Sequence, residues 1–275
     1  MTQRATKIHG NPSVVGQDGI LRGDCQSPLV GRTGVPTLIV GLSAFLLFLP
    51  FTACRAPHPP VDSALASCIP SDTVALAGAN LDQLRASPLY QKLPPALLQP
   101  LHDASYLLLA YNGKDILAVA RGAFHNPPPG AVLLARDLAV SGSPDAIRAA
   151  TAQHNTGRTG AAWLLDRAPS AAPLWVVALG GMAYPLPGDA ANLNRFLSFA
   201  DYASLSIHLD SGVRIDALGA ARNPDSAQRL EESLRALFTL ARAPKGIQLQ
   251  RDGLNIRVTI AVTMDQLLAI YSQLP

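Results

Sequence analysis

The chain has 275 residues, and 22 lysines and arginines against 19 acidic residues give it a formal charge of +3 at pH 7. Hydrophobic residues make up 48% of the chain, enough for a buried core without disulfide bonds. Without residues 1–53 the balance is 18 basic to 17 acidic residues, and the basic residues do not cluster. A nucleic-acid surface needs clustered positive charge, so nucleic acid is excluded as a partner.

Residues 1–32 are polar and rich in glycine, and they show no apolar periodicity. This composition predicts a disordered leader. The leader is long for a signal peptide, so the start of the chain could be misassigned, with Leu29 or Val30 as an alternative start.

Residues 33–54, TGVPTLIVGLSAFLLFLPFTAC, contain no charged residue. Arginines precede an apolar run that ends in small residues, which predicts a secretory signal peptide. Thr52, Ala53 and Cys54 resemble the lipobox of bacterial lipoproteins, whereas Phe51 departs from its usual aliphatic residue. The resemblance implies that Cys54 becomes the first residue of the mature chain and carries a lipid on its sulfur, since a thiolate is readily alkylated.

Two other interpretations of this segment remain open. Its 22 residues are enough to cross a bilayer as one uncleaved helix, or they could form a buried core helix. The lipoprotein signal and the uncleaved anchor both place the rest of the chain outside the cytoplasm and tethered to a membrane of a bacterial envelope. The final membrane, inner or outer, is left open.

Residues 55–68 are rich in proline and are predicted to form an extended tether. The globular domain is expected over residues 69–275. Cys25 belongs to the leader and Cys54 is the lipidation candidate, so Cys68 has no partner for a disulfide within the mature domain. We interpret Cys68 as a small buried or linker residue, because no nearby basic group would activate its thiol.

Turn residues between apolar runs predict three β-hairpins. Asn112-Gly113 is the strongest of these signals, and the other two turns lie at residues 210–212 and at Asp252-Gly253. The alternation around the last turn predicts a sheet with one buried face. Residues 174–179, LWVVAL, predict a further strand.

Capping signals predict the helices. Ser143-Pro144-Asp145 and Asn223-Pro224-Asp225 each open an amphipathic stretch, and a capping box opens another helix at Thr263. Asp-Gln-Leu follows a strand signal twice, at residues 82–84 and 265–267, which indicates an internal repeat. The expected fold is α+β with two layers: an antiparallel sheet of hairpins with helices packed on one face. We expect two degenerate ferredoxin-like halves, residues 69–160 and 161–275.

Residues 69–93, IPSDTVALAGANLDQLRASPLYQKL, resemble a family of extracytoplasmic bacterial proteins common in acidobacteria. Residues 143–149 and 173–176 are also similar to that family. The resemblance implies an extracytoplasmic location. The shared motifs are structural, so the resemblance implies no catalytic residues.

Catalytic and metal-binding patterns are missing from the sequence. It lacks a nucleophile elbow, and its histidines are scattered: His58, His102, His125, His154 and His208 follow the leader. Two Gly-Arg-Thr-Gly stretches, at residues 31–34 and 157–160, lack the lysine of a phosphate-binding loop. We therefore expect no cofactor and no metal.

Residues 151–200 are the least regular part of the chain and hold several aromatic residues, Trp163, Trp175, Tyr184 and Phe196. Irregular segments on a rigid scaffold often carry function. The sequence favours a membrane-tethered, non-enzymatic module that binds an envelope protein or ligand. The alternatives are an enzyme with an unrecognised site in residues 151–200 and a purely structural domain.

Overall fold

The structure is a computed structural model, and it describes residues 61–88, 90, 99–125, 130–169, 172–186, 191–209, 212–240 and 246–263. Residues 1–60, which include the predicted leader, the signal segment and the first six residues of the predicted tether, lie outside this described part. So do residues 264–275, where the last helix was predicted.

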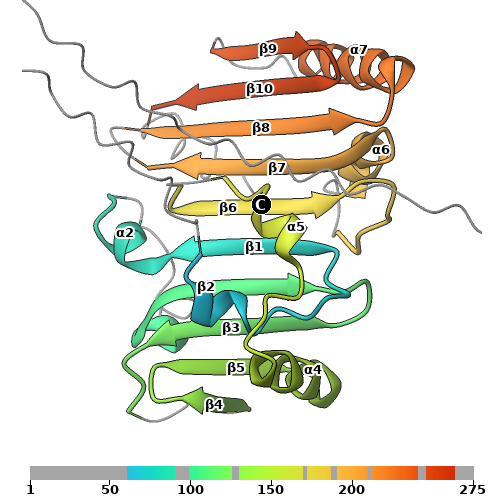
Figure 1. Cartoon of the computed structure of the whole chain (residues 1–275). Coiled ribbons are helices and arrows are strands. Elements are labelled where there is room, and N and C mark those ends of the chain that lie inside the picture. The colour runs from blue at the N-terminus through green and yellow to red at the C-terminus, as the bar shows by residue number, and fades with distance from the viewer. Residues whose placement is uncertain are drawn as a thin grey trace, which may run out of the picture. The chain divides into compact units, whose positions relative to one another are not determined.

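The described strands form one antiparallel sheet with the order β4-β5-β3-β2-β1-β6-β7-β8-β10-β9 (Figure 1). In chain order, the strands are β1 (Ala75–Asn80), β2 (Ala104–Tyr111), β3 (Ile116–Gly122), β4 (Ala131–Ala135), β5 (Leu138–Gly142), β6 (Leu174–Leu179), β7 (Ala200–His208), β8 (Val213–Ala221), β9 (Ile247–Asp252) and β10 (Asn255–Val262). The helices are α1 (Ser63–Ala66), α2 (Leu81–Arg85), the 3-10 helix η2 (Gln99–Leu101), α4 (Pro144–Asn155), α5 (Ala162–Leu165), α6 (Leu193–Leu197) and α7 (Pro224–Leu240). The α+β class and the antiparallel sheet are confirmed.

The three predicted hairpins and two of the predicted helix starts are present. Asn112 closes the β2–β3 turn by accepting hydrogen bonds from the amides of Lys114 and Asp115 at 3.0 and 2.8 Å. Ser143 caps α4 through its hydroxyl. Asn223 caps α7 by accepting from the Ser226 amide at 2.8 Å. Local capping and turn chemistry therefore accounts for these boundaries.

The strand order repeats about the centre of the sheet. From β1 outward the order is β1-β2-β3-β5-β4, and from β6 outward it is β6-β7-β8-β10-β9. The antiparallel pair β1–β6 joins the two sets, with Ala77 opposite Val176. The ferredoxin-like description of these halves is not confirmed. A split βαβ unit separates the strands that its helix connects, whereas β6 and β7 are direct antiparallel neighbours.

The largest core cluster lies on the side of the sheet that faces the viewer in Figure 1, which we call the front face. Leu76, Leu108, Val119 and Val177 project from the central strands into it. Helices α1, α4 and α5 contribute to the same cluster. Trp175 lies among these residues and is buried, and its indole N–H donates to the Tyr106 hydroxyl at 2.9 Å.

Helix α7 lies on the opposite side, the back face. Gly219 faces Leu230 of α7, and cross-strand pairs link Gly219 through Ala203 and Ala178 to Ala75. Residues directly opposite one another share a face, and Ala75 points away from its neighbour Leu76, which is on the front face. The helices are therefore divided between the two faces, rather than lying on one face as the sequence predicted.

The folded part begins before residue 69. Residues 63–66 form α1, and the side chains of Val61, Leu65 and Cys68 are buried in the front-face core. Asp62 caps α1 by accepting from the amides of Ala64 and Leu65 at 2.9 and 3.0 Å. Residues 61–68, assigned to the tether from proline content, therefore belong to the domain instead.

Candidate functional site

The lipidation candidate Cys54 and the apolar segment 33–54 lie outside the described residues, so their prediction stays untested. Within the ranges that the structure describes, no helix combines the length and the apolar character needed to cross a membrane.

Cys68 is buried beneath the C-terminal end of α4. Its sulfur lies 3.7 Å from His154 Nδ1, and the Ser67 hydroxyl lies 2.9 Å from the same nitrogen. Burial raises the pKa of the Cys68 thiol to about 11. The thiol therefore stays protonated at neutral pH, and the cluster is a packed structural contact rather than a nucleophilic site.

The other described histidines lie apart from one another. His102 is exposed and its Nδ1 lies 3.0 Å from the Asp103 carboxylate. His208 Nε2 lies 3.7 Å from Asp216, a carboxylate that also accepts from Thr259 at 2.8 Å and pairs with Arg214 at 3.1 Å. The His208 side chain lies in this polar network and is only one-fifth exposed (20%).

The aromatic residues of segment 151–200 are used mainly for packing. Trp175 is buried in the front-face core, and Phe196 packs beside α7. The Arg167 guanidinium lies against the rings of Trp163 and Tyr202. Its central carbon is 5.5 Å from the Trp163 ring centroid and 5.0 Å from the Tyr202 ring centroid. These contacts stabilise the loop after α5.

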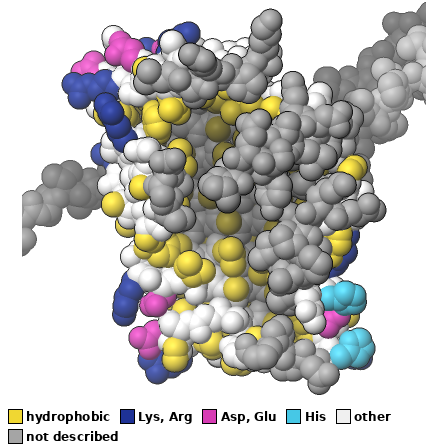
Figure 2. Space-filling view, turned by 180° about the vertical axis from the view of Figure 1, so that it is seen from behind, with side chains coloured by type: hydrophobic (Ala, Val, Ile, Leu, Met, Phe, Trp, Pro, Cys, Tyr) yellow, Lys and Arg dark blue, Asp and Glu magenta, His cyan; other side chains and the backbone are white. Residues whose placement is uncertain are grey.

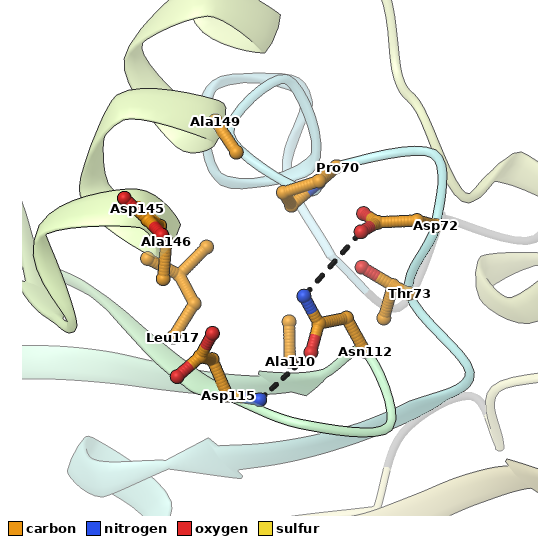
Figure 3. Close-up of a pocket in the computed structure, with 10 residues that line it drawn as sticks. All are labelled: Pro70, Asp72, Thr73, Ala110, Asn112, Asp115, Leu117, Asp145, Ala146 and Ala149. Atoms are coloured by element: carbon orange, nitrogen blue, oxygen red, sulfur yellow. Dashed lines mark hydrogen bonds between the residues drawn. The ribbon is translucent and has the colours of Figure 1, made fainter.

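The first of two described pockets lies between the start of α4, the β2–β3 turn and the segment before β1 (Figure 3). Its volume is about 200 Å³, and three aspartates line it: Asp72, Asp115 and Asp145. Figure 3 shows Asp72 and Asn112 pointing toward each other, and the Asn112 amide donates to Asp72 at 3.3 Å.

Two of these carboxylates already have partners. Asp145 lies in the first turn of α4, where a negative charge is favourable, and it pairs with Arg148. Asp72 accepts from Asn112. Among the described residues, no group of three or more possible ligands is arranged to hold a metal ion. The pocket is therefore best explained by turn and cap structure.

The second pocket lies near the other ends of β2 and β3, with a volume of about 340 Å³. Its two arginines are both engaged. Arg85 donates to the carbonyl oxygens of Leu101 and His102 at 2.8 Å, and Arg121 pairs with Asp62 at 2.6 Å and with Asp137 at 3.1 Å. The hydrogen bond and the charge of Asp62 raise the pKa of Arg121. Neither pocket is lined by a residue of segment 151–200, where an enzyme site was considered.

The back face carries a partly exposed row of apolar side chains at its centre. Ala77 of β1 lies opposite Leu109 of β2 on one side and opposite Val176 of β6 on the other. Leu109 is 39% exposed and Val176 is 40% exposed. The same row continues to Ala118 of β3 and Leu205 of β7. We call these five residues the apolar row; Figure 2 shows hydrophobic side chains along the middle of this face.

Sequence patterns give little signal for the apolar row. Apolar residues occupy both faces of β1, β2 and β6, as in a strand covered on both sides. Which of these residues stay exposed depends on where the helices pack. Only the register across five strands brings the row together.

The described residues form an α+β domain built on one antiparallel sheet, with a partly exposed apolar row on its back face. Comparisons with known proteins add little to this description. No protein-family model matches the chain, and no curated protein matches it. A solved structure described as "Structure of crystal form I of TP0453" aligns with 77% of this chain and 97% of its own chain, at 9% sequence identity and a TM-score of 0.41. A similarity this weak assigns neither a fold family nor a function.

Proposed function

We propose that the chain is a membrane-tethered, lipid-anchored binding module of the bacterial envelope, located outside the cytoplasm. The signal segment 33–54 and Cys54 support the location and the anchor. The resemblance of residues 69–93 to extracytoplasmic proteins common in acidobacteria points the same way. The apolar row supports the binding role, because two exposed apolar side chains, Leu109 and Val176, flank a third apolar residue there, and grouped exposed apolar side chains are typical of interaction sites.

The partner proposed for the apolar row is an amphipathic helix of another envelope protein. Leu109 and Val176 stand on either side of Ala77, two strand spacings or about 10 Å apart. That separation is close to the diameter of a helix with its side chains, so one apolar ridge could lie over Ala77. The row contains no charged side chain, which fits the apolar face of such a helix.

Site-specific photo-crosslinking tests this role. A photoreactive residue is placed at Leu109 or at Val176 of the full chain, which is expressed in a bacterium. Both positions should give a crosslinked product of the same mass. Leu254 is equally exposed but lies in the β9–β10 turn, so it is the matched control. Products that are equal at all three positions, or missing at Leu109 and Val176, would contradict binding at the row.

A second variant tests whether the crosslinked product depends on the shape of the apolar row. Ala77→Phe should remove the Leu109 product, because a bulky ring would occupy the space between Leu109 and Val176. A product that survives Ala77→Phe would place the partner elsewhere. Circular dichroism before and after heating checks that the variant remains folded.

Mass spectrometry of the mature N-terminus tests the anchor separately. A diacylglyceryl group on Cys54 is expected, and Cys54→Ser should abolish the modification. An intact N-terminus at Met1 would refute the lipoprotein assignment without affecting the crosslinking result.

A further inference from the structure

The two edges of the described sheet differ in chemistry. Strand β9, at one edge, has the sequence IQLQRD, with alternating polar residues and two charged residues at its end. Arg251 of β9 also lies 3.6 Å from Glu231 of α7. Charged and polar side chains on an edge strand discourage pairing with other chains.

Strand β4, at the other edge, lacks this protection. Its sequence is AVLLA, without a polar side chain. Val132 is 44% exposed on the front face and Leu133 is 39% exposed on the back face. Figure 1 shows β4 as the outermost strand at the lower end of the sheet, next to β5 only. Among the described strands only β5 pairs with β4, so its outer side presents backbone N–H and C=O groups that no described strand pairs, beside exposed aliphatic side chains.

We propose that β4 pairs antiparallel with β4 of a second copy of this chain, which joins the two sheets edge to edge. The residues that pair regularly with β5 are Ala131, Val132 and Leu133, and a bulge follows before Ala135. The pairing is therefore centred on Val132. The two Val132 side chains meet at a twofold axis on the front face, and each Leu133 lies opposite Ala131 of the other copy on the back face.

The strand is suited to itself as a partner. A twofold axis requires one surface to complement its own copy, and here a large residue meets a small one on the back face while identical β-branched residues meet on the front. No charge on β4 repels the same strand of a second copy. Three regular positions make a short ladder, so the dimer is expected to form in a concentration-dependent way. Confinement of the chain to a membrane would favour it, but the pairing does not depend on the apolar row or on the anchor.

Disulfide trapping of the full chain in detergent tests the pairing. Val132→Cys places two thiols at the axis, where opposite residues of antiparallel strands have Cα atoms within disulfide range. Mild oxidation should give a dimer of twice the chain mass on a non-reducing gel. Leu193→Cys, also exposed but away from both edges, and Gln250→Cys, on the β9 edge, are the matched controls. All variants share the native cysteines, so only the new position differs.

Adding Leu133→Lys to the Val132→Cys variant should abolish the dimer, because a lysine at an edge strand opposes pairing. Leu193→Lys in the same background should leave the dimer in place. The proposal is overturned if Val132→Cys forms dimer no faster than the two control cysteines, or if Leu133→Lys leaves the dimer unchanged while circular dichroism shows a folded chain. A Val132→Cys product linked to a different protein would also overturn it, and would show that this edge binds a foreign strand.

Discussion

Gly78 lies under the largest side chain of the core, so a single added methyl group is expected to destabilise the protein. A Cβ atom at Gly78 would fall well inside van der Waals contact of the Trp175 indole. Trp175 is buried, and its N–H is bonded to the Tyr106 hydroxyl. The indole therefore cannot swing into solvent without emptying the centre of the front-face core.

The cost of Gly78→Ala follows from two contributions. Forcing an extra methyl group into a packed core typically costs about 1–3 kcal/mol. Displacing the indole also breaks its hydrogen bond to Tyr106, which contributes about 1 kcal/mol. We therefore expect Gly78→Ala to lower the free energy of unfolding by about 2–4 kcal/mol.

Urea denaturation followed by circular dichroism measures this change. Gly219→Ala is the matched control, because a Cβ there meets only a terminal methyl group of Leu230, which can move. In a Trp163→Phe background the emission of Trp175 should shift to longer wavelength in Gly78→Ala. If Gly78→Ala costs no more than Gly219→Ala and leaves the emission unchanged, the indole does not pack on β1 as described.

Further predictions concern the thiol and the helix caps. Burial raises the pKa of the Cys68 thiol from 9.0 to about 11 on folding, so stability should fall as the pH rises from 9 to 11, by at most about 3 kcal/mol. Cys68→Ala should lack this alkaline loss in urea titrations at each pH, and an equal loss in both proteins would assign it to other groups. Asp62→Ala removes the α1 cap and one of the two carboxylate partners of Arg121, and should cost about 1–2 kcal/mol, whereas Asp62→Asn retains the cap acceptor and should cost less. Ser143→Ala should lower the melting temperature through the lost α4 cap, by about 1 kcal/mol of stability, and no change would show that Pro144 alone sets the helix start.

Elements with strong local signals were predicted correctly from the sequence. The Asn112-Gly113 turn and the caps at Ser143 and Asn223 depend on residues within a few positions of each other. The β4–β5 hairpin was missed because its turn residues, Arg136 and Asp137, carry no glycine signal. Helix α1 was missed because the proline content before it indicated a tether, although Asp62 is a good N-cap.

The candidate site depends on information that local patterns do not contain. Leu109, Ala77 and Val176 lie far apart in the sequence, and only strand pairing puts them in one row. The division of helices between the two faces likewise follows from packing, since α4 and α7 have similar opening sequences but cover opposite faces.

The sequence by itself determined the turns, the helix starts, the α+β class and the prediction of an exported, tethered chain, because each depends on neighbouring residues or on composition. Only the tertiary structure decided which apolar residues remain exposed and which edge of the sheet is unprotected. Exposure depends on the strand register and on where distant helices pack, and these are properties of the whole fold. For this reason Leu109 and Val132 look like core residues in the sequence and are surface residues in the protein.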